Sequence, residues 1–239
     1  MLTSTSGIIL KSIKYGDNSL IITIYTKLYG KLTFFVRING KKIKNQKQIL
    51  QSGFIVEIDF SYNQNKEFQH INNFSINEIY LSIPYNIVKS SIILVLSEIL
   101  NLVLKSEHQD ESLFYYISEA YKNLDNSEID YVNFHLFFLL KLSDYLGFSP
   151  DRNYSETNCF FDIVNGKFIN SKLNEFVLDQ KYSKFINSIL SANSLNNNIL
   201  SLNNIERTIL FQNIITYFSV HIENLSEIKS LKVLHDIFS

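Results

Sequence analysis

The stretch SLIITIYTKLYGKLTFFVR (residues 19–37) decides the fold of this chain. Two runs rich in Ile, Thr, Phe and Tyr flank a turn at Gly30, and this composition is typical of paired β-strands. Further runs of this strand-like composition lie before and after residues 19–37. The sequence therefore predicts strands at residues 6–15, 20–26, 31–36, 54–62 and 68–80. Short strands at this density favour a small closed barrel, because closure removes exposed strand edges. We expect a five-stranded OB-fold, with an SH3-like barrel as the alternative.

Helical patterns occupy the rest of the chain. Pro84 suits the first turn of a helix and is predicted to open a long one. Another helix should start after Ser127 as its N-cap and end at Gly147. Asn203 and Glu206 have the spacing of a capping box. Further helices are expected at residues 111–124, 180–190, 203–225 and 230–238.

Two segments depart from the helical pattern. Asn165-Gly166 lies between short apolar runs and predicts a β-hairpin near residues 159–170. Residues 191–200 are polar and predict a loop. The predicted fold class is thus α+β. Residues 1–80 form a five-stranded OB-fold barrel, and residues 81–239 form a mainly α-helical domain with one short hairpin.

Charge is distributed unevenly along the chain. The first 80 residues contain ten Lys and Arg against five Asp and Glu, a net charge of +5. The remaining residues contain 12 Lys and Arg against 18 Asp and Glu, a net charge of −6. Such asymmetry hints at a polyanion-binding module joined to a different one, although surface charge also varies by chance.

The basic half contains an interval without acids. Residues 18–56 hold no Asp or Glu, while several aromatic residues are interleaved with the cations there. Binding a phosphate backbone needs several cations on one surface, and bases stack on nearby rings. Since strand residues alternate, only one of Phe34 and Phe35 can face such a groove. We predict a DNA surface of Lys27, Arg37, Lys41, Lys42, Lys44 and Lys47, with Tyr29 as a weaker stacking candidate.

Catalytic and metal-binding motifs are absent from the sequence. It has no Gly-rich phosphate loop, no His-Glu-x-x-His and no Gly-x-Ser-x-Gly. Cys159 is the only cysteine, and the five histidines are scattered. We therefore expect no enzyme activity, cofactor or metal, and an unrecognised nuclease would need clustered acids. With no signal peptide or membrane span visible, we expect a cytoplasmic protein.

Several motifs occur in an order that resembles the RecO family of bacterial DNA repair proteins. They are GDNSLIITIYT (16–26), YGKL (29–32), LGFSP (146–150) and NGKF (165–168). The resemblance implies an OB-fold followed by a helical domain. It further implies a nucleoid-associated recombination mediator that binds single-stranded and double-stranded DNA and anneals complementary strands. Its implied partners are RecR and the single-stranded-DNA-binding protein. With RecR, it would help RecA to load on DNA that the single-stranded-DNA-binding protein coats.

The chain departs from the family pattern at Arg37-Ile38, where the family often has Arg-Gly, at Gln51-Ser52, where it often has Gln-Pro, and in its cysteines. Many members carry a four-cysteine zinc module after Leu-Gly-Phe-x-Pro, and here only Cys159 remains, so no zinc is expected.

An alternative function of another class also fits the charges. In that alternative the chain is a non-enzymatic adaptor whose basic barrel binds an acidic protein.

Overall fold

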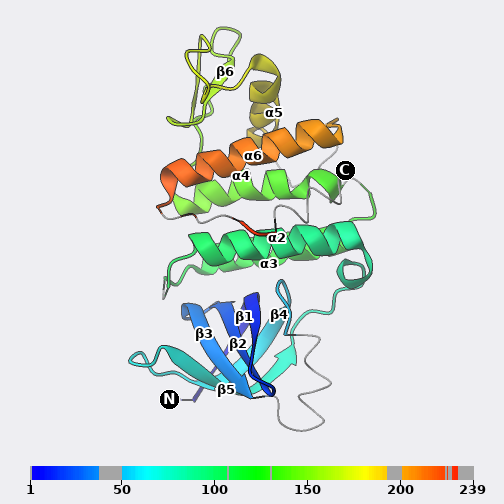
Figure 1. The fold of residues 1–239 in the computed structure, drawn as a ribbon, viewed down its shortest axis with the longest axis vertical. Helices are drawn as coiled ribbons and strands as arrows, with labels where there is room; N and C mark the ends of the chain where they lie inside the picture. Colours follow the sequence, from blue (N-terminus) through cyan, green and yellow to red (C-terminus); the bar gives the residue numbers. More distant parts are fainter. Residues whose placement is uncertain are drawn as a thin grey trace. The chain divides into compact units, whose positions relative to one another are not determined.

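The predicted N-terminal strands form a closed barrel in the computed structural model, which describes residues 2–37, 50–106, 108–129, 131–192, 201–223, 225 and 228–230. The strands are β1 (Leu2–Tyr15), β2 (Ser19–Thr26), β3 (Gly30–Arg37), β4 (Ile55–Ser61) and β5 (Phe68–Ile76). Their order around the barrel is β1-β2-β3-β5-β4, and β4 pairs with β1 (Figure 1). Only the β3–β5 pair is parallel among these strands. The predicted five-stranded OB-fold barrel is confirmed.

Alternation along the strands builds the barrel interior. On β2 and β3, even-numbered residues such as Ile22 and Phe34 are fully buried. Phe60 of β4 packs its ring 5.1 Å from that of Phe34. Because strand side chains alternate between faces, the odd-numbered residues of the same segments point outward.

Gly53 marks the point where the barrel meets α2 (Ile87–Val103). Its φ of +90° lies in the left-handed region, and a Cβ there would stand 2.0 Å from Ile93 Cγ2. The Tyr80 hydroxyl donates a 2.9 Å hydrogen bond to the Gly53 carbonyl. Only glycine satisfies both the backbone conformation and the close approach of the helix.

The first long helix begins later than predicted. Pro84 lies in a short 3₁₀ helix, η2 (Ile83–Tyr85), and α2 starts at Ile87. Asn86 has an extended backbone, and its side chain accepts hydrogen bonds from the Val88 and Lys89 N–H groups. This cap, which proline spacing does not reveal, separates η2 from α2.

Asp125 fixes the junction between the barrel and the helices. It lies near the end of α3 (Glu111–Asn126) and accepts hydrogen bonds from the backbone N–H groups of Leu81, Ser82 and Ile83. The buried Lys89 ammonium donates to the Asp125 carbonyl at 2.9 Å. The backbone donors just before η2 and at its first residue are thereby satisfied by a side chain.

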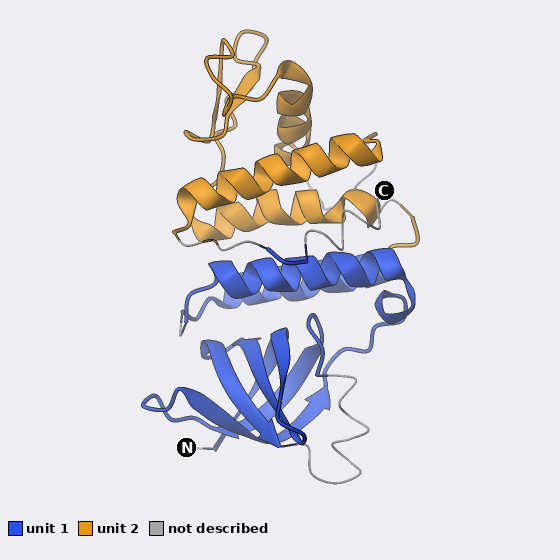
Figure 2. Ribbon diagram, viewed as in Figure 1, with its two compact units in different colours: residues 1–126, 228–231 blue, residues 127–227, 232–239 orange. Residues whose placement is uncertain are grey.

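The chain divides into two compact units (Figure 2). One comprises residues 1–126 and 228–231, and the other comprises residues 127–227 and 232–239. The second unit contains η3 (Tyr131–Asn133), α4 (Phe134–Leu146), β6 (Phe160–Asp162), β7 (Lys167–Ile169), α5 (Gln180–Leu190) and α6 (Asn204–His221). In the described parts of both units, no helix is long and apolar enough to cross a bilayer.

The helix ends of the second unit test the predicted caps. Ser127 is not the N-cap of α4, because η3 intervenes and Asn133 precedes the helix. Gly147 ends α4 in the left-handed conformation, with φ 82°, as predicted. The Asn203 capping box is also confirmed, while α6 ends at His221, earlier than expected. The predicted loop at 191–200 and helix at 230–238 lie mostly outside the described residues.

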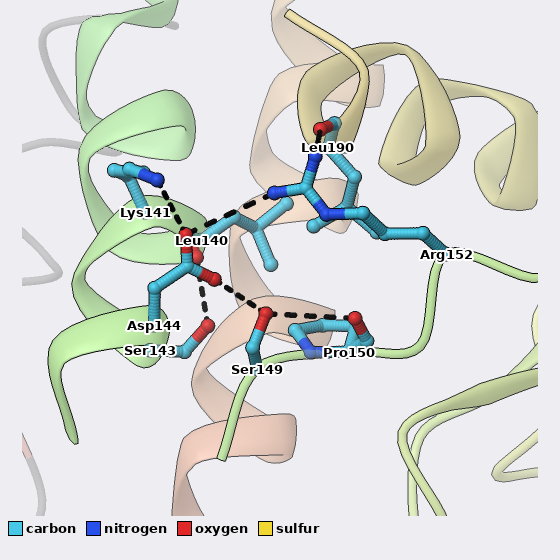
Figure 3. A network of polar contacts seen from close by, with 8 residues as sticks. All are labelled: Leu140, Lys141, Ser143, Asp144, Ser149, Pro150, Arg152 and Leu190. Carbon is cyan, nitrogen blue, oxygen red and sulfur yellow. Dashed lines mark hydrogen bonds and ion pairs between the residues drawn. The ribbon is translucent and has the colours of Figure 1, made fainter. Parts of the chain in front are cut away.

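The hairpin of β6 and β7 turns at Gly166 (φ 64°), as Asn165-Gly166 predicts. A polar network ties the segment before it to the helices (Figure 3). Asp144, on α4, accepts from Lys141 at 2.6 Å and from the Ser149 hydroxyl. Arg152 contacts both helices. Its Nη2 lies 3.9 Å from Asp144 Oδ2, and its Nη1 donates a 2.7 Å hydrogen bond to the Leu190 carbonyl. The network connects the end of α4, the loop after it and the end of α5.

Candidate nucleic-acid interface

Lys27, predicted to contact DNA, is held by α3. Its ammonium lies 2.8 Å from Glu111 Oε1 and donates a 2.6 Å hydrogen bond to the Tyr115 hydroxyl. The same ammonium stands 4.6 Å from the centre of the Tyr115 ring. The hydrogen bonds to Glu111 and Tyr115 raise the pKa of Lys27. Its charge is therefore already partnered within the first unit.

Two neighbours of Lys27 are also engaged by the protein. Lys31 donates to the Asn101 carbonyl at 2.9 Å, and desolvation lowers the pKa of Lys31. Tyr29, the predicted stacking residue, lies 5.5 Å from the Phe60 ring and 4.5 Å from the Tyr62 ring. Its half-buried ring already packs against the barrel core.

Arg37 lies at the other end of β3 and is exposed. Strand residues rise about 3.3 Å each, so roughly 20 Å separate the two ends of β3. The structure therefore does not bring Lys27 and Tyr29 together with Arg37. The remaining predicted cations, Lys41, Lys42, Lys44 and Lys47, lie outside the described residues.

The outward side of β1, β2, β3 and β5 carries three cross-strand rows, which we call the aromatic face. Pairing register fixes the rows, because residues opposite each other on neighbouring strands share a side of the sheet. The first row is Lys11, Thr23, Thr33 and Phe68; the second is Ile13, Ile21, Phe35 and His70; the third is Tyr15, Ser19 and Arg37.

Phe35 stands at the centre of the aromatic face. Its ring centroid lies 5.9 Å from Tyr15 and 6.2 Å from His70, edge to face in both pairs. Its neighbour Phe34 is fully buried, which confirms that only one of the two points outward. Tyr15 is 58% exposed and Phe68 is 37% exposed. Rings thus run across the sheet with part of their surface open to solvent.

Two of the acidic residues of the barrel, Glu57 and Asp59, lie on β4. Glu57, on β4, accepts hydrogen bonds from Ser6 Oγ at 2.7 Å and Ser4 Oγ at 3.2 Å. Asp59, two residues on, pairs across the sheet with Asn73 of β5. The three rows of the aromatic face contain no Asp or Glu. No carboxylate therefore belongs to the rows, although Asp17 lies in the turn between β1 and β2 and Glu67 lies in the loop directly before β5.

Sequence reasoning missed most of the aromatic face. Lys11 and Tyr15 precede the acid-free interval, and Phe68 and His70 follow it. Alternation on the hairpin strands could have identified the residues of β1, β2 and β3. The parallel pairing that puts His70 opposite Phe35 joins distant segments, so no local pattern reveals it.

The segment after residue 150 does not fit a zinc module. Among the residues that the structure describes, no three His, Cys, Asp or Glu side chains gather as metal ligands. Cys159, the only cysteine, accepts a 3.3 Å hydrogen bond from Gln180 Nε2. A structural zinc site takes four ligands, mostly thiolates and imidazoles, and this donor set is missing there.

Comparisons with known proteins agree with this architecture. Residues 1–80 match the family model "Recombination protein O N terminal", and residues 84–232 match "Recombination protein O C terminal". Relatives named DNA repair protein RecO are similar over 100% of both chains. The relative from Flavobacterium psychrophilum is 31% identical, and those from Azobacteroides pseudotrichonymphae and Bacteroides fragilis are each 30% identical. The chain therefore belongs to the RecO family of DNA repair proteins.

Proposed function

We propose that this protein is a recombination mediator that binds DNA through its barrel and acts without covalent chemistry. In this role it binds single strands, anneals complementary ones and, with RecR, helps RecA to load on DNA coated by the single-stranded-DNA-binding protein. One observation carries the proposal beyond family membership. The barrel carries cross-strand rows of exposed rings that contain no Asp or Glu and end at the exposed Arg37.

Arg37 is the anchor of the proposed phosphate contacts. Lys41, Lys42, Lys44 and Lys47 follow it within ten residues of sequence, and no acid occurs before Glu57. A cluster of cations binds a polyphosphate strand chiefly by releasing its counterions. We leave Lys27 outside the proposed surface, because Glu111 already partners its ammonium.

We further propose that the acidic remainder of the chain contacts proteins. Residues 81–239 carry a net charge of −6, which repels a phosphate backbone. A chain of this kind would hold DNA on one part and recruit RecR or the single-stranded-DNA-binding protein with another.

An annealing assay tests the proposal directly. Complementary oligonucleotides are mixed with the protein at two salt concentrations and without any nucleoside triphosphate. We expect faster annealing that weakens at high salt, because phosphate contacts are screened. Annealing no faster than that of the free strands would contradict the mediator function. Binding of an acidic peptide without any DNA binding would favour the adaptor alternative.

The phosphate surface has its own test. Neutralising Arg37, Lys41 and Lys42 together to Gln should weaken DNA binding across sequences. It should also reduce the slope of log affinity against log salt by up to about 3, one for each lost contact. A matched control neutralises the exposed Lys167, Lys172 and Lys184, which changes the net charge equally. Equal losses in the two folded variants would refute the placement of the site.

A further inference from the structure

We propose that the aromatic face is a base-stacking platform that selects single-stranded over duplex DNA. The inference rests on the proposed DNA-binding function and adds the residues and the discrimination. In it, Phe35, Tyr15 and His70 contact bases, while Arg37 and Lys11 hold the backbone on either side of them.

The first support is the continuity of the rings. Tyr15, Phe35 and His70 come from β1, β3 and β5, and successive centroids are 5.9 and 6.2 Å apart. Phe68 stands next to His70 on the same side of β5, opposite Thr33. The rings therefore form a path across the strands. A path of this kind contacts several successive nucleotides, as OB-folds do.

The second support is exposure. Ile13 is 45% exposed and Tyr15 is 58% exposed, although both are large apolar or aromatic residues on a sheet. The core needs none of these side chains, because the alternate residues Leu20, Ile22 and Phe34 already fill it. Contiguous apolar surface that the core does not use marks a binding site.

The third support is the arrangement of charge. Lys11 begins the first row and Arg37 ends the third, so exposed cations stand on both sides of the central rings. No Asp or Glu belongs to a row: Glu57 and Asp59 are on β4, and Asp17 and Glu67 are in the loops before β2 and β5. A strand with stacked bases and flanking phosphates matches this pattern. An apolar peptide would satisfy the rings and leave the cations unused.

Selection for single strands follows from what each form of DNA exposes. In a duplex the base faces are covered by their neighbours in the stack, and only phosphates and groove edges remain. A single strand can lay its bases on aromatic side chains, which binds any sequence because every base has a π-face. Removing the rings should therefore weaken single-strand binding alone.

The discriminating variant is Phe35→Leu, which keeps an apolar strand residue but removes the central ring. We measure affinity for an oligo-dT strand and for a duplex of equal length. Single-strand affinity should fall roughly tenfold, with duplex affinity and the salt slope unchanged. The matched control is Tyr85→Leu, since Tyr85 is an 88% exposed aromatic residue of the same unit outside the three rows.

A second variant tests contact without removing the ring. The chain has no tryptophan, so Phe35→Trp introduces a single tryptophan on the aromatic face, which can be excited selectively over the 14 tyrosines. Single-strand affinity should be retained, and oligo-dT should quench the emission. Tyr85→Trp serves as its control, with little quenching expected. Native-like circular dichroism of all four variants verifies that they fold.

The outcomes separate the inference from the function it rests on. If the wild-type protein binds no DNA, the proposed function fails. If it binds DNA but Phe35→Leu loses single-strand and duplex affinity equally, or loses neither, the stacking platform is wrong while the mediator function stands. Absence of quenching in a DNA-bound Phe35→Trp protein, or quenching by an acidic peptide instead, would also overturn it.

Discussion

At the scale of single residues, the Asp125 carboxylate alone accepts hydrogen bonds from three consecutive backbone N–H groups. Its carboxylate accepts from the backbone N–H groups of Leu81, Ser82 and Ile83, at 2.7, 2.9 and 2.8 Å. Burial alone would raise the pKa of Asp125, but these hydrogen bonds outweigh burial and lower the pKa below 3.8. The junction that follows the barrel thus depends on one negative charge.

Asp125→Asn should therefore lower the free energy of unfolding at neutral pH. An amide presents a donor where the carboxylate accepts, which leaves a buried backbone N–H without a partner and costs about 1–3 kcal/mol. Chemical denaturation measures the loss. Asp151→Asn is the control, because Asp151 is exposed and the change in charge is the same. A loss no greater than that of the control would contradict the assignment.

The same variant has a pH signature. Because folding lowers the pKa of Asp125, its stabilising effect is complete above pH 3.8 and disappears as the pH falls through the folded-state value. The difference between wild type and Asp125→Asn should shrink in acid. Denaturation curves between pH 7 and about pH 3 test this, provided both proteins remain folded at the start.

At the scale of elements, the β6–β7 hairpin is held by polar and aromatic contacts. The Asn153 side chain brackets Phe168, donating to its carbonyl and accepting from its N–H, both at 2.9 Å. Phe161 and Phe168 pack their rings 5.1 Å apart. Loop-rich segments often need disulfides or metal ions, since they bury little apolar surface. Here Asn153 makes the connection between the strand and the preceding loop.

We expect the hairpin segment to be insensitive to metal chelation. A zinc chelator should leave its protease resistance and the melting temperature unchanged, whereas Asn153→Ala should raise cleavage within residues 151–180 about tenfold. Asn170→Ala is the matched control, because Asn170 is exposed at the end of the hairpin. Increased cleavage on chelation, or identical cleavage of both variants, would count against this account.

At the scale of the whole molecule, the chain leaves its first unit after residue 126 and returns to it at residue 228. Glu98, on α2, receives the returning segment. Its carboxylate accepts from the backbone N–H groups of Lys229 and Ser230, at 3.0 and 2.8 Å, and from the Ser230 hydroxyl. Ile228 is buried beside it. One acidic side chain thereby attaches the returning segment at Lys229 and Ser230 to the first unit.

Glu98→Ala should release this attachment locally. Hydrogen exchange at the Lys229 and Ser230 amides should accelerate about tenfold, because their acceptor is lost, while the barrel amides keep their protection. Glu119→Ala on the neighbouring helix is the control, since Glu119 is exposed and pairs only with Lys122 among its described ion pairs. Unchanged exchange at the two amides would show that other contacts hold the segment.

Patterns of sequence predicted the elements better than their ends or their contacts. The barrel strands, the Gly166 turn and the Asn203 capping box follow from composition and short-range hydrogen bonding, so local sequence is enough to predict them. The Pro84 and Ser127 predictions were wrong because Asn86 and η3 set those boundaries. Proline and serine suit several positions near a helix start, and neighbouring side chains decide which one is used.

The sequence by itself determined a small five-stranded barrel, the helical remainder and a basic, acid-free interval, because alternation, helical periodicity and charge are local properties; the strand order that distinguishes an OB-fold from an SH3-like barrel came from tertiary pairing. Tertiary structure alone decided which cations remain available. It pairs Lys27 with Glu111, it directs the Lys31 ammonium to the Asn101 carbonyl, and it leaves Arg37 exposed. It also assembled the aromatic face by placing Phe35 opposite His70. The physical reason is strand pairing, which brings together residues that no local pattern connects.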